Sequence, residues 1–144
     1  MHFQPDYDTV YTYSRIDGGY MKIQKASEDY LEAMLMLKEK YGYIRSTDVA
    51  VLLGVTKPSV SYATKRLREN GYITMDKDGL ISLTDTGFEI AQRMYTRHKL
   101  LTEFFVRLGV DEKIAREDAC KIEHDISRES FDAIRAHIKK VGIE

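Results

Sequence analysis

Apolar residues recur every three or four positions over most of the chain, and this spacing is typical of amphipathic helices. Six segments follow the pattern, and each starts close to a residue suited to N-capping, such as Ser27, Thr56 or Ser127. We expect helices over 27–41, 47–53, 57–70, 84–108, 111–126 and 127–141. The hydrophobic pattern therefore predicts a mainly α-helical protein.

One segment between the third and fourth predicted helices departs from this spacing. Residues 72–75 and 80–83 are short apolar runs of the kind that form strands, and the Asp-Lys-Asp-Gly sequence between them is a turn. Gly79 suits that turn because glycine tolerates a positive φ. A helix, a short helix, a tight turn at Gly54, a third helix and a β-hairpin follow one another along the chain. This order predicts a winged helix-turn-helix with a small β-hairpin wing.

Three regions follow from these elements. Residues 1–21 show no helical period and contain a glycine pair, so we expect a flexible N-terminal extension. Residues 22–84 form the expected winged helix-turn-helix domain. Residues 85–144 contain the last three predicted helices and form a helical domain of their own.

Composition bounds the compartment and the partners of the chain. Its 144 residues include one cysteine, Cys120, which excludes an intramolecular disulfide and fits a reducing environment. Charged residues make up 31% and hydrophobic residues 43%, as is ordinary for a globular protein. No apolar run approaches the roughly 20 residues that span a bilayer. We therefore expect a cytoplasmic protein that does not interact with membranes.

The third predicted helix concentrates positive charge, although the whole chain carries a formal net charge of -1. Between Lys57 and Arg68 there are four basic residues and no acidic one. Hydroxyl and aromatic groups near the start of such a helix can reach base edges, and basic groups suit phosphates. The alternatives are a solvated helix face or a protein–protein adaptor, and double-stranded DNA is the favoured partner. The candidate DNA-binding residues are Thr56, Lys57, Ser59, Ser61, Tyr62, Lys65, Arg66 and Lys77.

Residues that bind transition metals gather in three places outside that helix. The first predicted helix carries two carboxylates, and the fifth carries a thiol, a carboxylate and an imidazole, in each case three or four positions apart on one face. A further histidine lies midway along the fourth predicted helix. Thiolate, imidazole and carboxylate together suit a divalent transition metal. The six candidate ligands are Asp29, Glu32, His98, Cys120, Glu123 and His124.

Each of these residues also has a purely structural explanation. A histidine such as His98 can be a hydrogen-bonded core residue, Cys120 can be a small buried hydrophobe, and acids near a helix start can complement its macrodipole. A metallohydrolase with Glu123 as base and His98 as ligand is a further alternative. Nothing in the sequence indicates a substrate pocket, so we do not expect an enzyme. The remaining alternative is a winged-helix regulator that senses a small organic ligand, or oxidation at Cys120, without metal.

Together these motifs resemble the metal-dependent repressors of the diphtheria toxin repressor and manganese transport regulator type. The resemblance is carried by residues 27–32, 58–61, 83–87, 97–101 and 119–124. It implies a repressor in metal-ion homeostasis that Mn²⁺ or Fe²⁺ activates to bind a palindromic operator as a homodimer. It also implies that residues 85–144 form the metal-binding and dimerisation domain and that all six candidate ligands bind the metal.

The chain combines features of both branches of that family. Asp29 matches the manganese branch, where the iron branch has Met, whereas Cys120 matches the iron branch, where the manganese branch has Glu. Thr102 and Arg116 stand where the iron branch has the acid and the histidine of an ancillary site, and Glu103 is a candidate substitute one position away. Five oxygen or nitrogen donors against one sulfur favour Mn²⁺. Six donors also favour two ions over one per subunit.

Overall fold

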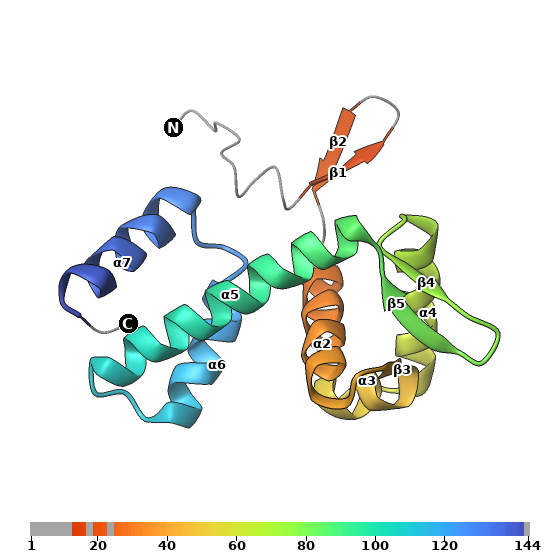
Figure 1. The fold of residues 1–144 in the computed structure, drawn as a ribbon, viewed down its shortest axis with the longest axis horizontal. Helices are drawn as coiled ribbons and strands as arrows, with labels where there is room; N and C mark the ends of the chain where they lie inside the picture. Colours follow the sequence, from red (N-terminus) through yellow and green to blue (C-terminus); the bar gives the residue numbers. More distant parts are fainter. Residues whose placement is uncertain (1–12, 17–18, 23–24, 143–144) are drawn as a thin grey trace. The chain divides into compact units, whose positions relative to one another are not determined.

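A computed structural model of the chain describes residues 13–16, 19–22 and 25–142. The chain divides into two compact units, one formed by residues 23–95 and the other by residues 1–22 and 96–144. The described part contains six helices and, besides a two-stranded hairpin, a three-stranded antiparallel sheet (Figure 1). This confirms the predicted fold class. None of the described helices is long and apolar enough to cross a membrane.

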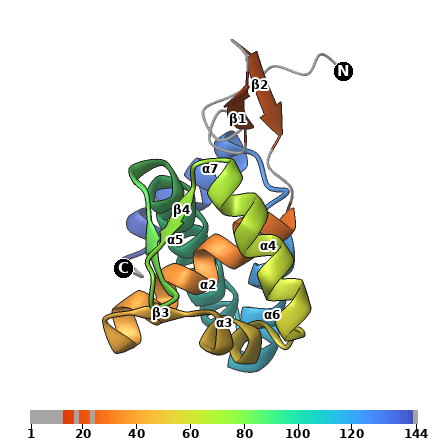
Figure 2. The ribbon, with the colours of Figure 1, turned by 90° about the vertical axis from the view of Figure 1, so that its right-hand side faces the viewer.

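The unit of residues 23–95 has the element order of a winged helix-turn-helix. Its helices α2, α3 and α4 contact one another, as can be followed in Figure 2, and side chains such as Leu31, Val49 and Leu67 form one core. Burial of these apolar faces stabilises even the short α3, because isolated helices of that length are marginal in water. The elements are α2 (Lys25–Tyr41), β3 (Ile44–Arg45), α3 (Ser46–Leu53), α4 (Lys57–Glu69), β4 (Ile73–Met75), β5 (Leu80–Leu83) and the first part of α5 (Asp85–Arg107).

Gly54 makes the tight turn between α3 and α4. Its φ of 66° lies in the left-handed region that favours glycine. Thr56 then caps α4, since its side-chain oxygen accepts a hydrogen bond from the amide of Ser59 at 3.2 Å. Pro58 follows in the first turn, where a missing amide hydrogen costs little. The predicted start of the basic helix is therefore confirmed.

The wing is a three-stranded antiparallel sheet in the order β3-β5-β4, and Ile44 lies opposite Ile81. The Asp76 carboxylate closes the hairpin between β4 and β5 by accepting hydrogen bonds from the amides of Asp78 and Leu80, each at 2.9 Å. The hairpin is confirmed. The sequence did not predict β3, because a two-residue strand is too short to show a period of two.

Residues 96–142 pack the rest of α5 with α6 (Glu112–Ile122) and α7 (Arg128–Lys140) around a second core. Ser127 caps α7 as predicted, because its side chain accepts a hydrogen bond from the amide of Ser130 at 3.1 Å. Asp111, predicted as the first residue of its helix, caps α6 by accepting a hydrogen bond from the amide of Lys113 at 3.1 Å. The buried residues of this core are Leu100, Leu101, Ala119, Phe131 and Ile138.

The starts of α2 and α3 differ from the prediction. Helix α2 begins at Lys25, so Ser27 lies inside its first turn and is not the N-cap. Arg45 occupies the N-cap position of α3 and makes no side-chain capping bond there. The strand pairing of β3 sets where α3 begins, and this long-range contact is invisible to local capping rules.

The end of α6 also differs. The helix stops at Ile122, four residues before the predicted end, because the amides of Asp125 and Ile126 both bond to the Ile122 carbonyl in a closing turn. Glu123 is the C-cap residue, and His124 lies in the turn that leads to α7. Two of the predicted ligands are thus carried by the turn instead of the helix itself.

Strands β1 (Tyr13–Ile16) and β2 (Gly19–Lys22) form an antiparallel hairpin, with Tyr13 opposite Lys22. The sequence predicted no strand in this region. The rest of the expected flexible extension, residues 1–12 and 17–18, lies outside the described residues, and its flexibility stays a prediction.

Candidate metal centre and nucleic-acid interface

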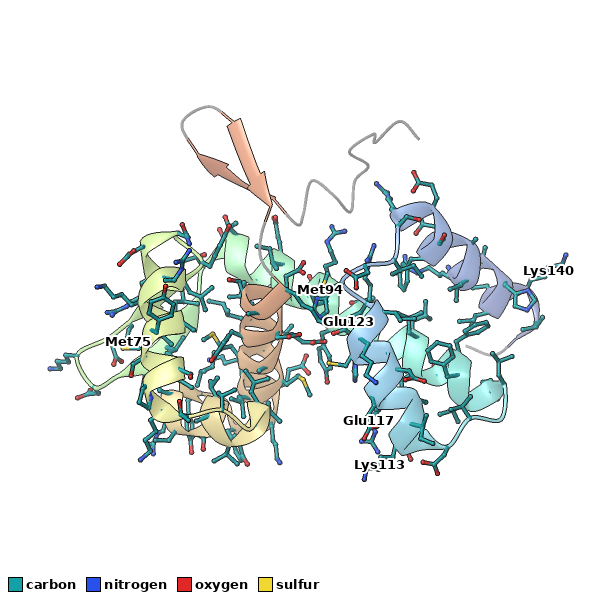
Figure 3. The ribbon with its side chains drawn as sticks, turned by 180° about the vertical axis from the view of Figure 1, so that it is seen from behind. Met75, Met94, Lys113, Glu117, Glu123 and Lys140 are labelled. Carbon is teal, nitrogen blue, oxygen red and sulfur yellow. The ribbon has the colours of Figure 1, made fainter. Side chains whose placement is uncertain are left out.

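Helix α5 and the turn after α6 bring two imidazoles to one buried carboxylate. Nδ1 of His98 lies 3.0 Å from Oε2 of Glu123, and Nε2 of His124 lies 3.5 Å from Oε1 of the same residue. The Glu123 side chain, labelled in Figure 3, is fully buried, whereas that of His98 is 18% exposed. Burying a carboxylate is costly unless positive charge or donors surround it. This His98–Glu123–His124 cluster is therefore suited to a cation.

Cys120 lies on α6 one turn before Glu123 and is exposed. Its Sγ is within 4.8 Å of a carboxylate oxygen of Glu123, so the thiol and the carboxylate can share an ion. Because the side chain is exposed, the alternative in which Cys120 is a small buried hydrophobe does not hold. Imidazole, carboxylate and thiolate donors together fit a divalent first-row transition metal.

Asp29 and Glu32 share a face of α2 in the other unit. Asp29 is partly exposed, and Glu32 is only 6% exposed. Burial raises the pKa of the Tyr95 hydroxyl above its usual range. The carboxylate of Glu39, to which this hydroxyl is hydrogen-bonded, and the carboxylate of Glu32 raise it further.

The six predicted ligands form two sets, two in the unit of residues 23–95 and four in the unit that contains residues 96–144.

The residues at the expected ancillary positions make contacts of their own. Glu103 lies 3.7 Å from Arg107, and Arg116 lies 3.3 Å from Glu112, in both cases as i,i+4 ion pairs with substantially exposed side chains. Such pairs contribute at most about 1 kcal/mol and place few demands on the fold. They give no support to Glu103 as a metal ligand.

Arg97, which is 2% exposed on α5, is a residue of this region that sequence reasoning missed. Its Nη1 donates hydrogen bonds to the carbonyl oxygens of Glu123 at 2.8 Å and Ile126 at 2.9 Å. Its place directly before His98 was the only available signal, since local sequence does not distinguish a buried arginine from the exposed basic residues of the same helix.

All eight predicted DNA-binding residues are exposed. The buried side chains of α4 are Val60, Thr64 and Leu67, so the basic face points away from the core of its unit. Thr64 is buried, whereas the neighbouring Ala63 is half-buried, and the Thr64 hydroxyl donates a hydrogen bond to the Ser61 carbonyl at 3.0 Å. The candidate residues therefore lie on the face of α4 that does not pack against the core.

Tyr62 and Arg66 form a pair on this face. Nη1 of Arg66 donates to the Tyr62 hydroxyl at 3.1 Å, and the guanidinium lies 5.7 Å from the centre of the Tyr62 ring. Beside them an open groove of about 590 Å³ runs between the first turn of α2, at Ser27, and α4, at Ser59. The sequence predicted both members of the pair but not their contact, which holds two groups suited to DNA in one arrangement.

Two family models match the chain and together cover most of it. The model described as the N-terminal DNA binding domain of iron dependent repressors matches residues 22–80. The model described as the iron dependent repressor metal binding and dimerisation domain matches residues 84–142.

Named relatives and solved structures agree with these models. An uncharacterised HTH-type transcriptional regulator of Methanocaldococcus jannaschii is 36% identical over 120 residues, which are 82% of this chain and 96% of that protein. The transcriptional regulator MntR of Escherichia coli is 36% identical over 129 residues, 86% of this chain and 83% of its own. A manganese-dependent transcriptional repressor in complex with manganese matches with a TM-score of 0.71 and 28% identity over 82% of this chain. The IdeR protein of T. acidophilum matches with a TM-score of 0.69 and 26% identity over 80% of this chain. The chain spans about half the length of these two structures, 53% of each.

Proposed function

The chain belongs to the family of iron-dependent repressors, and from this premise we propose how its own residues bind the activating metal and read DNA. Members of this family are metal-responsive, DNA-binding transcriptional regulators and not enzymes, so the metallohydrolase alternative is excluded. The alternative of a metal-independent sensor of oxidation or of an organic ligand is not favoured either. The activating ion is Mn²⁺ or Fe²⁺.

The proposed metal site combines both sets of donors. It consists of Asp29, Glu32, His98, Cys120, Glu123 and His124. The single observation that carries it is the His98–Glu123–His124 cluster, in which both imidazoles lie within 3.5 Å of one buried carboxylate. A bound divalent cation would supply positive charge to the carboxylates of the site and would join donors of the two units. Oxygen and nitrogen donors outnumber sulfur, which favours Mn²⁺, and six donors favour two ions per subunit.

The proposed DNA interface is the exposed face of α4 together with the wing tip. Thr56, Ser59, Ser61 and Tyr62 lie toward the start of the helix, where side chains reach base edges in the major groove. Basic side chains further along, and Lys77 at the hairpin, contact phosphates. In a homodimer two such helices about 34 Å apart would match successive major grooves of a palindromic operator in the cytoplasm.

The domain assignment follows from the two roles. Residues 22–84 are the reading domain, and residues 85–144 bind metal and dimerise. Asp29 and Glu32 belong to the first region and the other four ligands to the second, so one bound ion would restrict the motion of one region against the other. That restriction is the proposed switch, because two reading helices bind two half-sites together only when their spacing is held.

A gel-shift series tests the metal site. We expect Mn²⁺ or anaerobic Fe²⁺ to promote binding to an operator fragment selected from random DNA, and a chelator to abolish it. Glu123→Gln and His124→Ala should remove the metal response, whereas His137→Ala, an exposed histidine of α7, should retain it. A full metal response in both ligand variants would show that the site is placed wrongly.

A further inference from the structure

Arg97 connects α5 to the backbone of the turn that carries Glu123 and His124. It stands next to His98 on α5, is 2% exposed, and directs one nitrogen, Nη1, at two backbone carbonyls of the turn after α6. These carbonyls belong to Glu123 and Ile126, the residues that open and close the turn. One side chain of α5 thus holds the backbone on both sides of His124.

The two carbonyls need such a partner because the helix has ended. In a helix continuing past Ile126, the Glu123 carbonyl would accept the amide of residue 127. Instead Ser127 has extended backbone angles, with φ -68° and ψ 160°, and caps α7. The Glu123 carbonyl, at the C-cap of α6, has no partner within the helix and lies at the negative end of its macrodipole, so a buried guanidinium compensates both.

We propose that Arg97 is a positioning residue that sets the Glu123 and His124 side chains in place for the metal before any ion binds. This inference rests on the proposed metal site. The Glu123 backbone is held at 2.8 Å by Arg97, and its side chain is held at 3.0 Å by His98, the neighbouring residue on the same helix. Arg97 therefore contacts the Glu123 backbone and His98 contacts its carboxylate. Together these contacts fix the direction in which the carboxylate can present oxygen to a cation.

The chain offers a matched control for this role. The guanidinium of Arg97 lies 5.2 Å from the centre of the Phe131 ring, and that of Arg135 lies 4.9 Å from the same ring. Both arginines thus make the same aromatic contact, but the hydrogen bonds to Glu123 and Ile126 belong to Arg97. Arg97→Lys and Arg97→Met are compared with Arg135→Met, and His98→Ala serves as the reference for loss of a ligand.

The experiment measures Co²⁺ affinity and the Co²⁺ ligand-field spectrum on the full-length chain, with NMR of the imidazole groups in metal-free protein. We expect Arg97→Lys to weaken Co²⁺ binding about tenfold or more, the range typical of residues that orient ligands. Its spectrum at saturating Co²⁺ should differ from wild type, and the His98 and His124 resonances should shift without metal. Arg135→Met should leave all three unchanged. A merely structural arginine would lower thermal stability, yet saturating Co²⁺ would restore the wild-type spectrum.

The outcomes are separable. Should Arg97→Met fail to fold, Arg97→Lys alone decides, because a lysine retains the charge and can reach one carbonyl. Wild-type affinity and spectrum in Arg97→Lys, or equal changes in Arg135→Met, would overturn the role of Arg97. If His98→Ala itself binds Co²⁺ like wild type, the metal site is wrong. If His98→Ala loses Co²⁺ while Arg97→Lys keeps it unchanged, only the role of Arg97 fails.

Discussion

Cys120 is the one sulfur donor among the six proposed metal ligands. Its thiol is exposed and lies within 4.8 Å of a carboxylate oxygen of Glu123, so it adds a soft donor to nitrogen and oxygen ligands. Thiolates favour Zn²⁺, Co²⁺ or Fe²⁺ over Mn²⁺, whereas carboxylates suit Mn²⁺. In the proposed site, the identity of this one side chain would therefore tune metal preference without changing the framework around it.

We predict that Cys120→Glu shifts the preference of the protein toward Mn²⁺. The variant should lower the ratio of Zn²⁺ to Mn²⁺ affinity because a hard oxygen replaces the sulfur. Competition titrations with both ions against a chelating dye measure the ratio, and Cys120→Ser provides a control that removes the thiol without adding a charge. An unchanged ratio in Cys120→Glu would show that Cys120 does not contact the ion. Thermal unfolding should stay close to wild type, since the position is exposed.

Tyr62 is a proposed DNA-binding residue whose hydroxyl and ring both contact Arg66. The hydroxyl accepts a hydrogen bond from Arg66 at 3.1 Å, and Tyr62 is 63% exposed. Tyr62→Phe keeps the ring under the guanidinium but frees the Arg66 fork, so we expect operator affinity to fall about two- to tenfold, the worth of one hydrogen bond. Fluorescence anisotropy at fixed salt measures the change, and Tyr41→Phe, an exposed tyrosine at the end of α2, is the control. Equal affinities of wild type and Tyr62→Phe would assign the contact no part in recognition.

At the scale of elements, local chemistry was sufficient to predict most helices and the hairpin. Thr56, Asp111 and Ser127 each satisfy an amide of the turn that follows them, and such contacts between near neighbours can be read from sequence. Helical spacing also places candidate ligands on α2, α5 and α6, although Glu123 and His124 lie in the turn after α6. Local rules therefore predict the starts of α4, α6 and α7 and the faces that the helices present.

Strand β3 and the turn after α6, which local rules missed, depend on partners distant in sequence. Strand β3 exists because Ile44 pairs with Ile81, which lies 37 positions further along the chain. The turn that follows the early end of α6 is bonded to Arg97 of α5, which donates hydrogen bonds to the carbonyls of Glu123 and Ile126. A periodic pattern carries no information about such partners, so the turn that bears Glu123 and His124 could not be predicted.

The N-cap of α4 is the local contact whose removal we expect to lower the stability of the reading domain. We predict that Thr56→Ala destabilises the protein by about 1 kcal/mol, because the Ser59 amide loses its acceptor. For a domain of this size the loss corresponds to a melting temperature lower by about 4–8 °C. Thr47→Ala is the matched control, since it removes the same group from the first turn of α3, where no side-chain capping bond is made at the N-cap. Calorimetry should register a clear decrease for Thr56→Ala only, and equal decreases would contradict the assigned cap.

At the scale of the whole molecule, charge is distributed unevenly. The formal net charge is -1, yet the exposed face of α4 carries Lys57, Lys65 and Arg66. Attraction to DNA must therefore come from this local concentration, because a nearly neutral chain produces no general attraction. Each basic contact to a phosphate releases counterions, so affinity falls steeply with salt. The position of α4 relative to DNA, more than total charge, then decides binding, and this is the quantity that a metal-dependent restriction of the domains would control.

The two binding events must be coupled in both directions if that restriction is the switch. A coupling free energy of about 1–3 kcal/mol, typical of allosteric proteins, raises operator affinity about 5- to 150-fold when metal is bound. Thermodynamic linkage then requires operator DNA to raise the affinity for metal by the same factor. We predict equal factors in the two measurements, because both describe one cycle of four states.

The test determines Mn²⁺ affinity by chelator competition with and without saturating operator, and operator affinity with and without saturating Mn²⁺, all at one ionic strength. Non-specific DNA of equal length is the control, because it attracts Mn²⁺ through its phosphates without engaging both reading helices in register. Glu123→Gln should show little coupling in either direction, since its side chain is the shared partner of both imidazoles. If operator leaves Mn²⁺ affinity no higher than non-specific DNA does, and Mn²⁺ leaves operator affinity unchanged, the proposed switch is contradicted.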